Sequence, residues 1–145
     1  MSARRILILA TNHALQGAEG STGLQVDDPT YLVLVKNLIS REEIDCVFEE
    51  ASGNKTKARS LATPELRYLD VDPFGDERRE LKIPAGFVPE WYAIYDGSEP
   101  NIPKPEPFAL RKKVVELLAR EAVWLERIDR TAFVSGLLIC GEMHG

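Results

Sequence analysis

The sequence has few residues of the kinds that build disulfide frameworks or metal knuckles. It contains two cysteines, Cys46 and Cys140, and two histidines, His13 and His144. Each cysteine lies inside an apolar run, where a free thiol behaves as a small hydrophobe, and two cysteines form neither a disulfide framework nor a zinc knuckle. We therefore expect buried, reduced thiols and a cytoplasmic protein.

Long apolar runs and excess positive charge are also missing. The apolar run near the N-terminus covers only residues 6–10, which is too short for a signal peptide or a membrane span. The net charge of −5 provides no basic field for nucleic acid or anionic lipid. We expect no nucleic-acid or membrane partner, which leaves a small molecule or peptide and a second copy of the chain.

The glycine-rich loop at residues 14–28 lacks the usual phosphate-binding motifs. Its glycines are spaced G-x-x-G-x-x-G, whereas the dinucleotide fingerprint is G-x-G-x-x-G and a P-loop has its own pattern. A nucleotide or phosphate binder acting through this loop is kept as a third hypothesis.

The composition is that of an ordinary globular domain. Apolar residues make up 44% of the chain and charged residues 28%, and 145 residues suffice for one core. We expect a single domain over residues 1–145.

Short, continuous apolar runs indicate strands that are buried on both faces, as in a parallel sheet. Asp28 and Pro29 predict the start of a helix that ends near Ile39, and a short helix is expected over 55–62. Another helix is expected over 110–128, with one apolar face made of Leu110, Val114, Leu117, Leu118, Ala122, Leu125 and Ile128. The order predicts a three-layer α/β fold, with a mostly parallel four-stranded sheet and helices on both faces. The predicted strands are Arg5 to Ala10, Asp45 to Glu50, Arg67 to Val71 and Gly136 to Cys140.

Residues 84–107 interrupt this pattern, because they hold six of the nine prolines together with Phe87, Trp91, Tyr92 and Tyr95. Such a segment is neither sheet interior nor a long helix. It is interpreted as a loop that wraps the core, with a lid or a partner surface as the alternative.

Both histidines follow predicted strands, at the sheet edge where α/β proteins bind ligands. If the spatial order of the strands is third, second, first, fourth, the first and last strands are neighbours and His13 approaches His144. Of the two glutamates that end the second strand, alternation directs Glu49 and Glu50 to opposite faces, and we expect Glu50 to face the shared site.

Two imidazoles and one carboxylate suit Zn²⁺, Mn²⁺, Co²⁺ or Fe²⁺. Without a metal, the same residues offer a general base and an acid. The structural alternatives are a turn-capping His13, a frayed His144 at the chain end and a solvated Glu49–Glu50 pair.

The strand-ending histidine, the glutamate of DCVFEEA and the late motif Gly141–Glu142–Met143–His144 resemble the superfamily of TraB and TIKI proteins, ChaN-like haem-binding proteins and erythromycin esterases. In the first motif Ala10 stands in place of glycine. The resemblance implies a divalent-metal hydrolase site with Glu50 as its carboxylate. Relatives continue past the second motif, so the resemblance also implies a last strand exposed on one face unless another subunit covers it.

The leading hypothesis is a metal-assisted hydrolase with His13, Glu50 and His144 as catalytic residues and metal ligands. The rival is a non-catalytic binding or assembly module that uses residues 84–107 and an exposed last strand.

Overall fold

The computed structural model describes residues 3–17, 28–83 and 115–141, and of residues 115–117 the backbone only. The predictions for His144, for residues 84–107 and for most of the loop at 14–28 lie outside these ranges. In the described part of the chain, no helix has the length and apolar character that crossing a bilayer requires.

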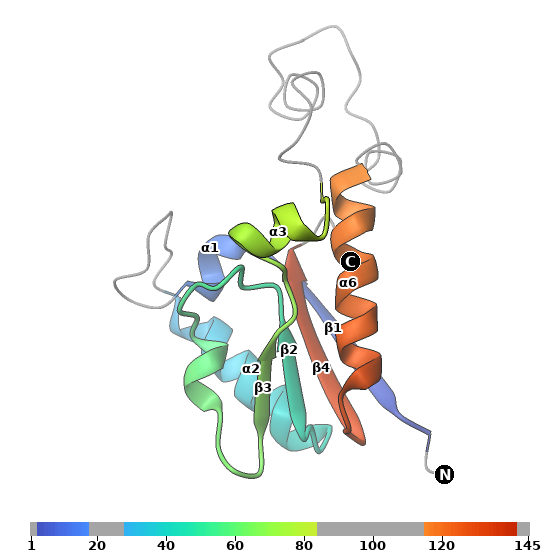
Figure 1. The fold of residues 1–145 in the computed structure, drawn as a ribbon. Helices are drawn as coiled ribbons and strands as arrows, with labels where there is room; N and C mark the ends of the chain where they lie inside the picture. The colour runs from blue at the N-terminus through green and yellow to red at the C-terminus, as the bar shows by residue number, and fades with distance from the viewer. Residues whose placement is uncertain (1–2, 18–27, 84–114, 142–145) are drawn as a thin grey trace, which may run out of the picture.

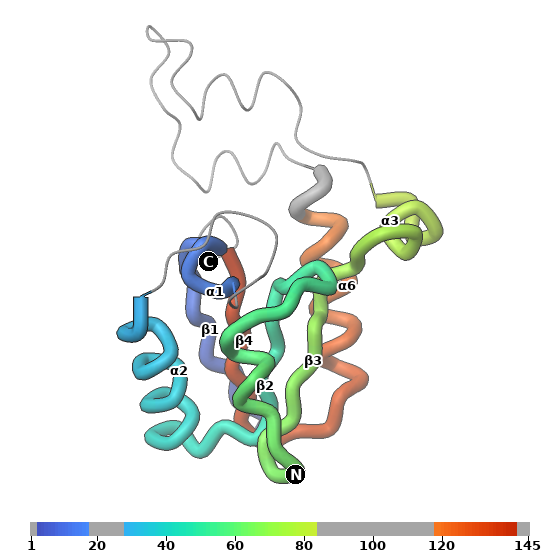
Figure 2. The backbone as a smooth tube through the Cα atoms, turned by 90° about the vertical axis from the view of Figure 1, so that its left-hand side faces the viewer, coloured from blue at the N-terminus to red at the C-terminus, as the bar shows by residue number. Residues whose placement is uncertain are grey.

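The fold is α/β, with a four-stranded parallel sheet between helices on both faces (Figures 1 and 2). All four predicted strands are confirmed with small shifts of their ends. They are β1 (Arg5–Thr11), β2 (Cys46–Glu49), β3 (Arg67–Asp70) and β4 (Ser135–Gly141).

The strand order is β1-β4-β2-β3, so the expected order, with the first strand between the second and the last, is wrong. β4 lies between β1 and β2, and all seven of its residues are buried. The prediction of an exposed last strand is therefore also wrong. The physical reason is that β4 is apolar or small at every position, which suits a central strand, whereas β1 begins with Arg5, directly after Arg4, and occupies the edge. The first and last strands are neighbours, as expected.

Helix α2 (Pro29–Arg41) covers one face of the sheet, toward β1 and β4. Its N-terminus forms where predicted, because the carboxylate of Asp28 accepts a 2.9 Å hydrogen bond from the amide of Thr30. The buried cluster on this face contains Tyr31, Val35, Ile44, Val47, Ala58, Leu137 and Ile139.

Helix α6 (Val115–Arg130) covers the other face. Among residues 118–130 of this helix, Arg120, Trp124 and Ile128 are buried, whereas Leu118 and Leu125 are exposed, so the predicted apolar face of the last helix is only partly right. The part of that prediction at residues 110–114 lies outside the described residues. The cluster on this face contains Cys46, Phe48, Val71, Trp124, Ile128, Phe133, Leu138 and Cys140.

Three short helices lie at the carboxyl edge or in loops: α1 (His13–Gln16), η1 (Ala58–Leu61) and α3 (Asp76–Glu80). The helix expected over 55–62 is reduced to the 3-10 turn η1. The charge run at 75–81 contains α3. Both cysteines are buried, as expected, and they form no disulfide with each other.

Candidate functional site

The carboxyl ends of β1, β2 and β4 bring His13, Glu50 and Gly141 together. The imidazole Nε2 of His13 lies 3.5 Å from Oε2 of Glu50. The same carboxylate oxygen accepts a 2.7 Å hydrogen bond from the amide of Gly141. Two of the three predicted site residues, His13 and Glu50, therefore lie side by side, and Gly141 of the late motif is hydrogen-bonded to Glu50.

The position of His13 follows from the end of β1. Asn12 caps α1, with its side-chain oxygen accepting a 2.9 Å hydrogen bond from the amide of Ala14. His13 is the first residue of the resulting turn, and 59% of its side chain is exposed. Its ring thus lies between solvent and the buried carboxylate of Glu50.

Gln16 fixes the orientation of the His13 ring. Its amide nitrogen donates a 3.1 Å hydrogen bond to Oε1 of Glu49, and its amide oxygen lies 2.6 Å from Nδ1 of His13. Because the oxygen only accepts, the hydrogen of the neutral imidazole resides on Nδ1. The lone pair of Nε2 then faces Glu50.

Glu49 and Glu50 face opposite sides of the sheet, as strand alternation predicts. Both are buried, so the alternative of a solvated strand end is wrong. Glu49 accepts hydrogen bonds from Thr56 at 2.5 Å and from Tyr68 at 2.7 Å, in addition to the one from Gln16. Burial raises the pKa of Glu49, and these three hydrogen bonds oppose the rise only in part.

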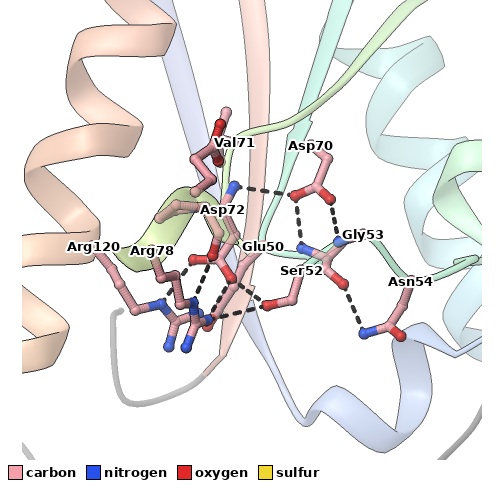
Figure 3. Close-up of polar contacts among 12 residues, drawn as sticks. Glu50, Ser52, Gly53, Asn54, Asp70, Val71, Asp72, Arg78 and Arg120 are labelled. Atoms are coloured by element: carbon pink, nitrogen blue, oxygen red, sulfur yellow. Dashed lines mark hydrogen bonds and ion pairs between the residues drawn. The ribbon is translucent and has the colours of Figure 1, made fainter. Parts of the chain in front are cut away.

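On the α6 side, Glu50 belongs to a buried ionic cluster (Figure 3). Arg120 bridges two carboxylates: its terminal nitrogen contacts Oε1 of Glu50, and its Nε lies 2.7 Å from Oδ1 of Asp72. Arg78 contacts the second oxygen of Asp72 at 3.0 Å. Two guanidinium groups thus neutralise two buried carboxylates and hold Glu50 in place.

Asp72 has further donors. Trp124 of α6 donates an indole hydrogen bond of 3.0 Å to Oδ1, and the hydroxyl of Ser52 contacts Oδ2. Asp72 therefore ties the segment after β3 to α6 and to the loop after β2.

Asp70, at the end of β3, has a local role. Its carboxylate accepts hydrogen bonds from the backbone amides of Ala51, Gly53 and Asp72, at 2.6–3.2 Å (Figure 3). These bonds shape the turn that follows β2 and keep Asp70 apart from the His13 contact.

Sequence reasoning missed Gln16 and Arg120. Gln16 belongs to a loop that showed no helical signal, and its importance depends on a contact with Glu49 that is distant in sequence and on one with His13 in the same turn. Arg120 lies within LAREAVWLERI, where nothing in the local pattern separates a buried arginine from an exposed one. Arg78, from the charge run at 75–81, lies 3.0 Å from Asp72 after β3.

Within residues 3–17, 28–83 and 115–141, no three histidine, cysteine, aspartate or glutamate side chains form a group suited to a metal ion. The pair of His13 and Glu50 supplies two such groups, and the third predicted ligand, His144, lies outside these ranges.

The chain matches no protein-family model, and the comparisons with curated proteins and with solved structures gave no match. The likeness to the TraB and TIKI superfamily therefore stays a prediction made from motifs.

Proposed function

We propose that the carboxyl edge of the sheet binds a divalent cation through His13 and Glu50 and that the protein is a metal-assisted hydrolase of a small molecule or peptide. One observation carries the proposal: Nε2 of His13 and an oxygen of Glu50 face each other across 3.5 Å, and with the hydrogen of the neutral imidazole on Nδ1 both atoms are acceptors. Two acceptors at this separation favour a cation or a hydrogen-bond donor between them.

The distance is compatible with two ligands of one ion, because bonds of roughly 2.0 to 2.2 Å to imidazole nitrogen and carboxylate oxygen span it at an angle near the tetrahedral value. Imidazole with carboxylate suits Zn²⁺, Mn²⁺, Co²⁺ or Fe²⁺. His144 is the third ligand in this proposal. A bound ion would lower the pKa of a coordinated water to about 7 and so supply hydroxide near neutral pH.

Neighbouring side chains would orient the two proposed ligands, His13 and Glu50, before an ion binds. Gln16 keeps the hydrogen of His13 on Nδ1, and Glu49 holds the amide of Gln16. Such outer contacts orient metal-binding histidines and typically contribute 10- to 100-fold in affinity. Arg120 holds the carboxylate of Glu50 in place while one of its oxygens remains directed at His13.

Metal titration tests the proposal without a known substrate. Tag-free protein, stripped with a chelator, is titrated with Zn²⁺ and with Mn²⁺ in a calorimeter. We expect His13→Ala and Glu50→Gln each to weaken binding at least tenfold. Glu65→Gln removes a carboxylate from an exposed position and should leave binding unchanged. Equal affinities in the wild type and the two site variants would contradict the proposal.

Two further variants separate the roles of the neighbours. His144→Ala weakens binding only if His144 is the third ligand. Gln16→Leu keeps the size of the side chain but removes both hydrogen bonds, so we expect a 10- to 100-fold loss of affinity with all proposed ligands present.

A further inference from the structure

We infer that the edge strand β1 pairs with β1 of a second copy of this chain, so that two sheets join into one. Within the described part of the chain, β1 is hydrogen-bonded to β4 on one side and to no strand on the other (Figure 2). An open strand edge is a template for another strand. This inference is independent of the proposed metal site.

The register of β1 shows which backbone groups point away from the sheet. The amide of Arg5 donates to the carbonyl of Val134, directly before β4, and Arg5 pairs with Ser135, so Arg5 and every second residue after it are bonded to the β4 side. The amide and carbonyl groups of Ile6, Ile8 and Ala10 therefore point outward. These three residues can bond to another strand.

The same three residues form the uncovered face of β1. Ile8 pairs with Leu138 and Ala10 pairs with Cys140, both of which belong to the core cluster under α6. Yet Ile6 and Ile8 are exposed, Ile8 by 57%. On the opposite face, Leu7 and Leu9 pack against the α2 cluster. The sheet is thus covered by α2 at β1 but not by α6.

Helix α6 continues this apolar surface. Leu118 and Leu125 are seven residues apart and exposed, Leu125 by 66%. Asp129, one turn after Leu125, is ion-paired with Arg4 at the start of β1, whereas Arg127 contacts Glu77 of α3 on the other flank. Leu118 and Leu125 therefore lie on the flank of α6 that faces β1, and with Ile6 and Ile8 they form one apolar strip.

Residues 6–10 of β1 lack the features that usually prevent an edge strand from pairing with another strand. Proteins protect edge strands with charges, prolines or bulges. Residues 6–10 contain no charge and no proline, and their pairing with β4 has no bulge. Arg4 and Arg5 precede them, but Arg4 is paired with Asp129 and Arg5 with Glu42 within the same chain.

The strand is complementary to itself. In an antiparallel pair centred on Ile8, all seven residues overlap, with Ile6 opposite Ala10 and Arg5 opposite Thr11 of the second copy. The outward residues then form the hydrogen-bonded pairs, giving about six new bonds. No like charges face each other. A two-fold axis at Ile8 joins the two apolar strips, as a closed dimer requires.

Cross-linking tests this geometry. In the proposed pair the two Ile8 Cα atoms would be about 5.5 Å apart, within disulfide range. Oxidised Ile8→Cys protein should form a covalent dimer at least tenfold faster than Leu81→Cys, whose position is similarly exposed at 47% but lies after α3. Cys46 and Cys140 are each 1% exposed and add little background. Equal rates for the two variants would overturn the inference.

Light scattering and hydrogen exchange complete the test. Wild-type protein at about 100 μM should show twice the 16.2 kDa chain mass, and Ile8→Lys should return it to the monomer. A wild-type monomer, or a dimer that survives Ile8→Lys, contradicts the proposed pairing. The amides of Ile6, Ile8 and Ala10 should gain protection as concentration rises. Protection at every concentration would mean that another part of the same chain covers the edge, which also overturns the inference.

Discussion

Gly141 lies so close to the imidazole of His13 that a side chain at position 141 would collide with the ring. A Cβ at position 141 would lie 2.5 Å from Nε2 of His13 and 3.3 Å from an oxygen of Glu50. The His13 side chain is more than half exposed, so it can turn toward solvent when the space is filled. The glycine of the late motif thus allows the ring to face the carboxylate.

We therefore expect Gly141→Ala to change metal binding and not stability. Zn²⁺ affinity should fall at least tenfold in calorimetry, because the displaced imidazole no longer faces Glu50. The free energy of unfolding should stay within about 1 kcal/mol of the wild type, since alanine is favoured over glycine in a strand.

Gly136 provides the matched control in the same strand. A Cβ there would lie 2.9 Å from the ring of Phe48 and 3.1 Å from that of Phe133. Both rings are buried and pack edge to face at 5.0 Å, so neither has room to move. Gly136→Ala should cost about 1 to 3 kcal/mol of stability and leave the metal affinity intact. The reverse pattern for the two variants would contradict this account of Gly141.

Arg120 should contribute strongly to stability. Its replacement by methionine removes the Arg120 guanidinium from Glu50 and leaves Arg78, Trp124 and Ser52 on Asp72. Removing one partner of a buried ion cluster typically costs about 3 to 5 kcal/mol. Urea unfolding measures the loss. Arg130→Met is the control on the same helix, because Arg130 forms an exposed pair with Glu126 and should cost less than about 0.5 kcal/mol. Equal losses would show that the cluster is not strongly stabilising.

Two tyrosines on the α2 face should respond in opposite ways to the loss of their hydroxyl groups. The buried hydroxyl of Tyr31 has no hydrogen-bond partner among the described residues, whereas that of Tyr68 donates to Glu49 at 2.7 Å. Tyr31→Phe should leave stability unchanged or raise it by up to about 1 kcal/mol, and Tyr68→Phe should lower it by about 1 to 3 kcal/mol. Thermal or urea unfolding of the two variants decides this. A large loss for Tyr31→Phe would mean that its hydroxyl has a partner.

The fold class could be predicted because strands and helices leave local patterns. The four buried strands appear as continuous apolar runs, and Asp28 with Pro29 marks a helix start. The order of strands could not be predicted, since no single run specifies its neighbours. After α6 the chain enters the sheet between β1 and β2, which places β4 in the centre. This position buries both faces of β4, and no local pattern specifies it.

The candidate site was predictable only where it follows from strand periodicity. Alternation at the end of β2 predicts that Glu49 and Glu50 face opposite sides, and Glu50 is favoured for the site because it lies nearer the strand end. Gln16 and Arg120 act through contacts between residues 33 and 70 positions apart, Gln16 with Glu49 and Arg120 with Glu50. Helical spacing predicts that Leu118 and Leu125 share an apolar face with Ile128, but it does not show what covers that face, and both leucines are exposed.

The raised pKa of Glu49 gives a prediction with a definite sign. The folded protein holds the carboxyl proton at pH values where the unfolded chain, with an ordinary value near 4.5, has released it. The free energy of unfolding therefore falls as pH rises from about 4.5 through the raised folded value, and this contribution then stays constant. At low pH, where Glu49 is protonated in both states, the penalty for burying its charge is absent.

Glu49→Gln removes this dependence, because glutamine does not titrate. Urea unfolding of metal-free protein between about pH 4 and 8 should show the wild type losing stability relative to Glu49→Gln as pH rises, until the difference levels off. Glu65→Gln, at an exposed position, should run parallel to the wild type over the same range. If the curves for the wild type and Glu49→Gln are also parallel, Glu49 releases its proton alike in folded and unfolded chains. Such a result would mean that burial does not raise the pKa of the Glu49 carboxyl that accepts the hydrogen bond from Gln16.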